Sequence, residues 1–310
     1  ILLLSLTFLV SIEEVFTSEK IKIGLLVPLT GENSEIGQSI IKSTRLAINK
    51  INDPSFEIIP SDTKSNPTDT LRAAKKFGEL GIKIVIGPVF NKNQAYLDEL
   101  KEITFISLTN KGDNKSKNII NAGINATSQL NGIKKFIKLS KIKKTIFLTP
   151  DVSYKNEIEK AIDQSKIKIL ANHIYKTDPT KLTNQIEDIT NYKQRKQNLK
   201  DEIARLEKSN QNNKEKLIER LKKKDTLGGV NFDSIIIADF DESLKSVTTS
   251  LLYTDISPKK KYFITLNQWF DDTLLGEASS QPLYFPSINK KNYENFSLEY
   301  FNKFGQYPNE

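Results

Sequence analysis

The chain has 310 residues, of which 37% are hydrophobic and 27% charged, and its formal net charge at pH 7 is +8. At about 150 residues per domain this length predicts two domains, and the composition excludes a disulfide miniprotein, a collagen-like fibre and a wholly disordered chain. Cysteine and methionine are absent and His173 is the single histidine, which excludes a thiol nucleophile, a cysteine zinc site and a lipid anchor on cysteine.

The first 18 residues differ from the rest. Residues 1–10 form an apolar run, followed by Ser11, Glu13 and Glu14 and then a mixed segment that ends in Thr17 and Ser18. Ten residues are too few to span a membrane but are typical of the hydrophobic region of a secretory signal peptide. We therefore expect residues 1–18 to be a signal peptide clipped at its start, and the mature protein to be periplasmic and not membrane-spanning. The alternative is a buried strand or helix. Because no methionine begins the sequence, we also expect it to be part of a longer gene product, truncated at both ends.

From residue 21 onward, short β-branched runs alternate with helical patterns. This alternation is typical of βαβ units and predicts parallel sheets. In lobe one the predicted strands are 21–28, 56–60, 82–86 and 103–109. Three helices are predicted. The first ends at about residue 52, the second begins at Pro67 after an Asn66 N-cap, and the third lies around 96–100.

A second series of the same kind follows the joint at about 121–123. Its predicted strands are 145–148, 168–175, 234–238 and 262–266, and its predicted helices are 127–139, 156–164 and 242–253. The sequence thus predicts an α/β protein of two Rossmann-like lobes with parallel sheets, covering residues 19–121 and 122–270. Residues 271–310, with a strand at 283–285 and a helix at 293–304, are expected to return toward lobe one.

The segment 193–225 holds most of the net charge. It contains twelve lysines or arginines and six acids, so it carries +6 of the +8. Apolar residues recur at heptad spacing from Leu199, but the polar run 209–213 interrupts them, which predicts an antiparallel helical hairpin of about 184–208 and 214–225 inserted in lobe two. Its lysines either form a solvated face or dock on another protein or on anionic lipid. No aromatic residue lies between Tyr192 and Phe232, which argues against nucleic acid.

Motifs of enzymes are missing. The sequence has no GxGxxG, GxxxxGK[ST], HExxH or GxSxG motif. We therefore expect a non-enzymatic protein with no cofactor and no metal.

The candidate ligand site lies where strands end. Ligands of open parallel sheets bind beyond the carboxyl ends of the strands, and two such lobes face a shared cleft. Hydroxyls, amides and helix-start N–H groups there suit a small zwitterion, with Asp239 available for its ammonium group. The predicted ligand-binding residues are Asn91, Thr109, Asn110, Tyr154, Asp239 and Trp269, and further strand-end residues are Thr30 and Asp62.

Several of these stretches resemble a known family. Residues 23–31 (IGLLVPLTG), 36–38 (IGQ), 86–88 (IGP) and 105–107 (FIS) resemble type I periplasmic binding proteins of the leucine/isoleucine/valine-binding group. Residues 107–110, 267–272 and 301–308 are similar to the penicillin-binding protein activators, a branch of the same superfamily.

The resemblance implies a two-lobed hinge protein that closes on a small polar, amino-acid-like ligand. In the receptor group it implies that Asn91 and Thr109 hold a ligand carboxylate, that Tyr154 closes the site, and that the partner is the membrane permease of an ABC importer. In the activator branch it implies a regulator that contacts a peptidoglycan synthase. Asn91, followed by Lys92, departs from the small hydroxyl of the receptor pattern, and Lys155 follows Tyr154 where that pattern has a glycine.

Overall fold

The computed structural model describes residues 20–111, 116–266 and 272–309, which form two compact units. Unit 1 comprises residues up to Gly123 together with Glu294–Glu310, and unit 2 comprises Ile124–Tyr293. The predicted signal peptide, residues 1–18, lies outside the described residues.

Unit 1 is built on a sheet of five parallel strands in the order β2-β1-β3-β4-β5. Its strands are β1 Ile21–Val27, β2 Phe56–Asp62, β3 Ile84–Ile86, β4 Thr104–Ser107 and β5 Ile119–Asn121. Its helices are α1 Ser34–Ile51, α2 Pro67–Glu79 and the larger part of α10 Lys290–Phe304, with two 3-10 turns, η1 Asn91–Gln94 and η2 Leu97–Glu99.

Unit 2 repeats this architecture with the strand order β10-β9-β8-β6-β7, again all parallel. Its strands are β6 Thr145–Pro150, β7 Ala171–Tyr175, β8 Ser234–Ile237, β9 Tyr262–Thr265 and β10 Leu283–Tyr284. Its helices are α3 Ala126–Leu139, α4 Lys155–Ser165, α5 Pro179–Ile189, α6 Tyr192–Glu207, α7 Lys214–Lys222, α8 Asp241–Tyr253, α9 Asp272–Leu275 and the 3-10 turn η3 Ala278–Ser280. The predicted α/β fold with two parallel-sheet lobes is confirmed.

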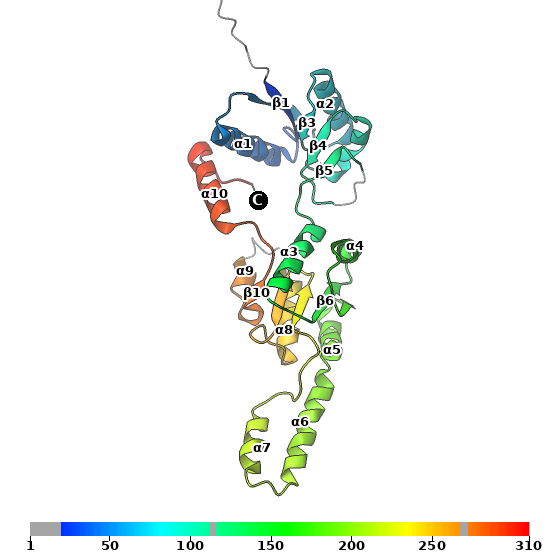
Figure 1. Ribbon diagram of the computed structural model, residues 1–310, viewed down its shortest axis with the longest axis vertical. Helices are drawn as coiled ribbons and strands as arrows, with labels where there is room; N and C mark the ends of the chain where they lie inside the picture. The colour runs from blue at the N-terminus through cyan, green and yellow to red at the C-terminus, as the bar shows by residue number, and fades with distance from the viewer. Residues whose placement is uncertain (1–19, 112–115, 267–271, 310) are drawn as a thin grey trace, which may run out of the picture. The chain divides into compact units, whose positions relative to one another are not determined.

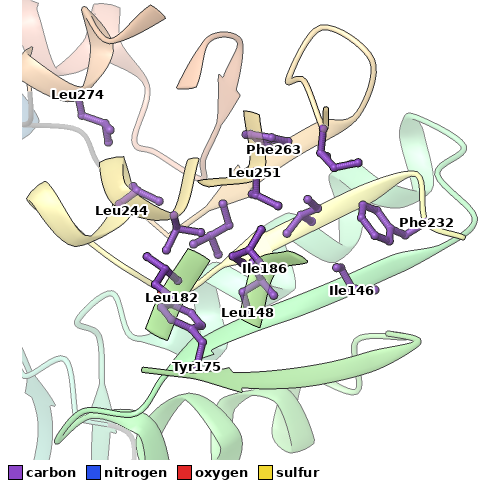
Figure 2. Packing of buried hydrophobic residues seen from close by; sticks show 14 residues of the cluster. Ile146, Leu148, Tyr175, Leu182, Ile186, Phe232, Leu244, Leu251, Phe263 and Leu274 are labelled. Atoms are coloured by element: carbon purple, nitrogen blue, oxygen red, sulfur yellow. The ribbon is translucent and has the colours of Figure 1, made fainter. Parts of the chain in front are cut away.

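The sheet of unit 2 has a buried apolar layer on each face. Successive residues of a strand point to opposite faces, so Leu148 and Ile146 pack with α5 and α8, whereas Phe147 packs with α3 and α4. Figure 2 shows the first layer, where Leu148 lies near Ile186 of α5 and Leu251 of α8. Ile146, Phe147 and Leu148 are thus buried one after another along β6, which is typical of a strand covered on both faces.

The predicted hairpin is present in unit 2, but its first helix begins later. Residues 184–191, predicted as its start, belong to α5 and to a break at Asn191, whose φ is +50°. Residues that adopt a left-handed conformation end regular helices, so α6 starts afresh at Tyr192. Figure 1 shows α6 and α7 extending from the end of unit 2 away from its sheet.

Two other elements differ from prediction. The helix predicted around 96–100 is the short 3-10 turn η2, because Tyr96 has φ +66° and interrupts the segment. The return toward lobe one, expected from residue 271, begins in the structure at Glu294: β10 pairs with β9, which keeps the residues before it in unit 2.

Candidate functional site

The carboxylate of Asp239 is the centre of a hydrogen-bond cluster at the strand ends of unit 2. Asp239 is 3% exposed, and each of its carboxylate oxygens accepts two hydrogen bonds from donors among the described residues. Oδ1 accepts from the Tyr154 hydroxyl (3.3 Å) and from the backbone N–H of Phe240 (2.9 Å). Oδ2 accepts from Ser243 Oγ (2.6 Å) and from the Tyr175 hydroxyl. A carboxylate has about four lone-pair positions, so all of them are used here.

Three different elements bring these donors together. Tyr175 is the last residue of β7, Tyr154 caps the N-terminus of α4, and Ser243 lies in the first turn of α8. Asp239 itself follows β8, which is separated from β7 by β6 alone. Because parallel strands end at the same edge of a sheet, this topology places the three donor side chains within hydrogen-bond distance of the Asp239 carboxylate.

Both tyrosines of the cluster are held in their protonated form. Burial, followed by the negative charge of Asp239, raises the pKa of Tyr154 and of Tyr175 above the ordinary value of a phenol. Each hydroxyl therefore remains a hydrogen-bond donor at neutral pH and is no general base.

A second carboxylate at this edge is neutralised by lysines. Asp151 follows β6 and forms ion pairs with Lys155 of α4 (2.8 Å) and with Lys176. Hydrogen bonds from these two ammonium groups, with their charge, lower the pKa of Asp151 to about 2. Lys155, which departs from the receptor pattern, thus has a partner four residues earlier, in the loop between β6 and α4.

In unit 1 the corresponding edge includes the carboxylate of Asp62, at the end of β2. It accepts hydrogen bonds from the backbone N–H groups of Leu29 (2.8 Å) and Lys64 (2.8 Å) and from Thr30 Oγ1 (2.6 Å). Burial raises the pKa of Asp62, but these hydrogen bonds outweigh it and the net pKa is lowered. The carboxylate closes the loop that follows β1.

A neutral network lies at the same edge of unit 1. The Gln94 side-chain amide of η1 donates to Ser107 Oγ (2.7 Å) and to Asn121 Oδ1 (2.8 Å), and the Ser107 hydroxyl donates to the Pro88 carbonyl (3.0 Å). The backbone is tightly packed here, because a Cβ on Gly87, whose φ is +105°, would lie 2.2 Å from the Leu26 carbonyl oxygen. Only glycine fits that position.

Of the predicted ligand residues, the structure brings Tyr154 and Asp239 together. Asn91 and Asn110 are exposed in unit 1, whereas Thr109 is 4% exposed and its hydroxyl accepts a hydrogen bond from the Lys111 N–H (3.2 Å). Trp269 lies outside the described residues. The roles of these side chains toward a ligand stay predictions.

Sequence reasoning missed three members of these clusters. Tyr175 ends a predicted strand, and the strand-end rule that selected Asp239 also applies to it. Ser243 lies one helical turn after Asp239, a spacing that places both on the same side of a helix start. Gln94 lies three residues after Asn91, between the predicted strand 82–86 and the predicted helix around 96–100, and no sequence signal points to it.

Three described carboxylates at these strand ends, Asp62, Asp151 and Asp239, are each held by donors of their own chain. Within residues 20–111, 116–266 and 272–309, no cluster of three histidine or acidic side chains could hold a metal ion. In the same ranges the helices are all too short or too polar to span a membrane.

Comparison with known proteins identifies the family. The sequence profile described as periplasmic binding protein matches residues 20–198, more than half of the chain. The chain belongs to the periplasmic binding protein family. No curated protein sequence matches it.

Solved structures of this fold are similar at low sequence identity. A Rhodospirillum rubrum protein assigned as a branched-chain amino acid ABC transporter has a TM-score of 0.64 at 12% identity, over 94% of this chain and 79% of that one. The C-domain of LpoA from Haemophilus influenzae, a regulator of PBP1A, has a TM-score of 0.58 at 14% identity, over 90% and 78%. Full-length LpoA from the same organism has 0.57 at 13%; the match covers 84% of this chain but 41% of the LpoA chain. These likenesses establish the fold.

Proposed function

We propose that this periplasmic binding protein is an exported, non-enzymatic regulator that acts through contact with a peptidoglycan synthase, rather than a carrier of amino acids. The proposal is carried by Asp239. An amino-acid receptor must offer a free acceptor to the ligand ammonium group, because burying an unpaired charge is costly. The Asp239 carboxylate accepts four hydrogen bonds from Tyr154, Tyr175, Ser243 and Phe240.

The other carboxylates at the strand ends support the same proposal. Asp62 accepts three hydrogen bonds and Asp151 is paired with two lysines. A zwitterion binding at either edge would have to displace one of these partners. The likeness in fold to LpoA, a regulator of PBP1A, supplies the class of partner.

A second candidate function is a solute receptor of an ABC importer for a small, amino-acid-like ligand. Tyr154 favours it, because this half-buried hydroxyl at the N-terminus of α4 bonds Asp239 at the long distance of 3.3 Å and could turn toward a ligand. The partner would then be a membrane permease. The fold likeness to the Rhodospirillum rubrum protein supports this candidate.

Two measurements on the same protein separate these functions. The first is binding to the periplasmic domain of the peptidoglycan synthase of the same organism, together with the rate of glycan polymerisation. The second is thermal denaturation with a panel of amino acids. A ligand that binds only the folded state stabilises it by about 2.7 kcal/mol at a hundred times its dissociation constant.

We expect synthase binding, a changed polymerisation rate and no thermal shift with any amino acid. A shift with one amino acid that is lost in Asn91→Ala or Asn110→Ala, without synthase binding, would overturn the proposal and support the receptor. Both asparagines are exposed, so these substitutions leave the core of unit 1 intact.

A further inference from the structure

The hairpin of α6 and α7 is fixed to unit 2 by a buried arginine. Arg195 of α6 is 4% exposed, and its guanidinium donates to the Thr190 carbonyl (3.0 Å), to Thr226 Oγ1 (3.0 Å) and to the Thr254 carbonyl. These acceptors lie before α6, after α7 and at the end of α8. The guanidinium thus ties both ends of the hairpin to the body of the unit.

Further contacts reinforce this base. The Thr226 hydroxyl donates a hydrogen bond to Asp255 Oδ2 (2.6 Å), and the Tyr192 hydroxyl donates to Asp225 Oδ2 (2.8 Å). The backbone N–H of Leu227 donates to the Arg195 carbonyl (3.0 Å). Burying an arginine is costly unless its guanidinium is hydrogen-bonded, as it is here. A loop that served only to connect two strands would not need such a buried charged anchor. The hairpin is therefore held in one direction.

The exposed side of α7 is basic. Lys216, Arg220 and Lys223 recur at i, i+4 and i+7, so they lie on one face, here called the basic face. Leu217, Ile218 and Leu221 are half-buried on the other side of the helix. All three basic residues are exposed, and none has an ion-pair partner in the part of the chain that the structure describes.

Basic residues of α6 differ in this respect. Arg205 is paired with Glu202 (2.7 Å), and Lys193 lies 3.4 Å from Glu187. Lys196 contacts the Tyr192 ring, 5.0 Å from its centroid. The charge of α6 is thus largely used within the unit, whereas the charge of the basic face is available to a partner.

The surroundings of the basic face favour a protein partner over a membrane. Among the described residues, no large hydrophobic side chain between 193 and 231 is exposed, so the hairpin has nothing to insert into a lipid interface.

We infer that the basic face of α7 docks on an acidic surface of a partner protein. The inference rests on the proposed function, since the synthase domain is the partner it is tested on. Charged groups at such surfaces govern the association rate and its salt dependence, so binding should weaken between about 50 mM and about 300 mM salt.

The test compares two charge reversals of equal size. K216E/R220E/K223E changes the basic face, and K75E/K76E/K83E changes three exposed lysines of unit 1. We expect the first to weaken binding to the synthase domain about tenfold or more and the second to have less than about a twofold effect. Equal effects of the two triples would overturn the inference while leaving the proposed function in place. K216Q/R220Q/K223Q, which adds no negative charge, guards against misfolding of the first triple.

A poly-glutamate peptide and phosphatidylglycerol vesicles serve as further probes. If the unmodified protein fails to bind the synthase domain, the proposed function fails. The inference then stands if the protein binds the peptide and K216E/R220E/K223E abolishes that binding while K75E/K76E/K83E does not. It is wrong if both triple substitutions, or neither, reduce binding of the peptide. Binding to the vesicles that depends on the basic face, without binding to the peptide, would overturn it in favour of a lipid surface.

Discussion

Asp62 and Asp239 occupy similar places in the two units and yet have different surroundings. Asp62 ends β2, an edge strand of its sheet, and is partly exposed, whereas Asp239 follows β8, the central strand of its sheet, and is buried. The donors to Asp62 all come from the loops beside it, but those to Asp239 come from three different elements. The position of a strand in the sheet decides whether its terminal carboxylate closes a local loop or joins the elements of a unit.

Asp239→Ala should have the largest effect in this comparison. The substitution leaves the buried Tyr175 hydroxyl without its acceptor and removes three further hydrogen bonds, so we expect a loss of about 3 kcal/mol in the free energy of unfolding. Urea denaturation measures it, followed by circular dichroism and by the fluorescence of Trp269, the single tryptophan. Asp163→Ala, an exposed carboxylate of α4, is the matched control. A loss below that of Asp62→Ala would contradict the comparison.

The two tyrosines of the cluster allow the stabilisation from a buried hydrogen bond to be compared with that from a half-buried one. Tyr175→Phe should cost about 1.5 kcal/mol, because Tyr175 is 1% exposed and Asp239 Oδ2 then loses one of its two donors. Tyr154→Phe should cost about 0.5 kcal/mol, since its bond is 3.3 Å long and water can reach the half-buried side chain. Denaturation of both variants under the same conditions gives the order, and the reverse order would show that Tyr154 is the principal donor.

Asp62→Ala should cost about 1 kcal/mol, less than Asp239→Ala. Its three donors lie in partly exposed loops, where water can replace the carboxylate oxygens. Thr30→Val provides a matched control, because it removes only the side-chain hydrogen bond of 2.6 Å. Hydrogen exchange of the Leu29 and Lys64 amides should become faster in Asp62→Ala and stay unchanged in Asp239→Ala. Faster exchange of both amides in Asp239→Ala would indicate that the two carboxylates are coupled.

The comparison also shows what the sequence could predict. Alternating periodicity located most of the strands and long helices, because a buried strand and an amphipathic helix differ in their repeat. Strand order is a property of the folded sheet, so the sequence could select Asp62 and Asp239 as strand-end carboxylates but could not tell the edge strand from the central one. The three-residue β5 is too short to have a period. The breaks at Tyr96 and Asn191 are left-handed residues other than glycine, which sequence patterns rarely signal.

Substitution of Asp151 should have the smallest effect on the free energy of unfolding. It extends the comparison to a carboxylate that is held by ion pairs. Its pKa is lowered to about 2 by Lys155 and Lys176, below the value of about 3.8 expected in the unfolded chain. A group with a lowered pKa stabilises the folded state above its unfolded pKa and loses that contribution as the pH falls through its folded pKa. The difference in unfolding free energy between the unmodified protein and Asp151→Asn should therefore be constant above about pH 5 and shrink between about pH 4 and pH 2. Denaturation across this pH range measures the difference, with Asp163→Asn as the matched exposed control. A difference that grows as the pH falls would mean that the lysines hold Asp151 less tightly in the folded state than in the unfolded one.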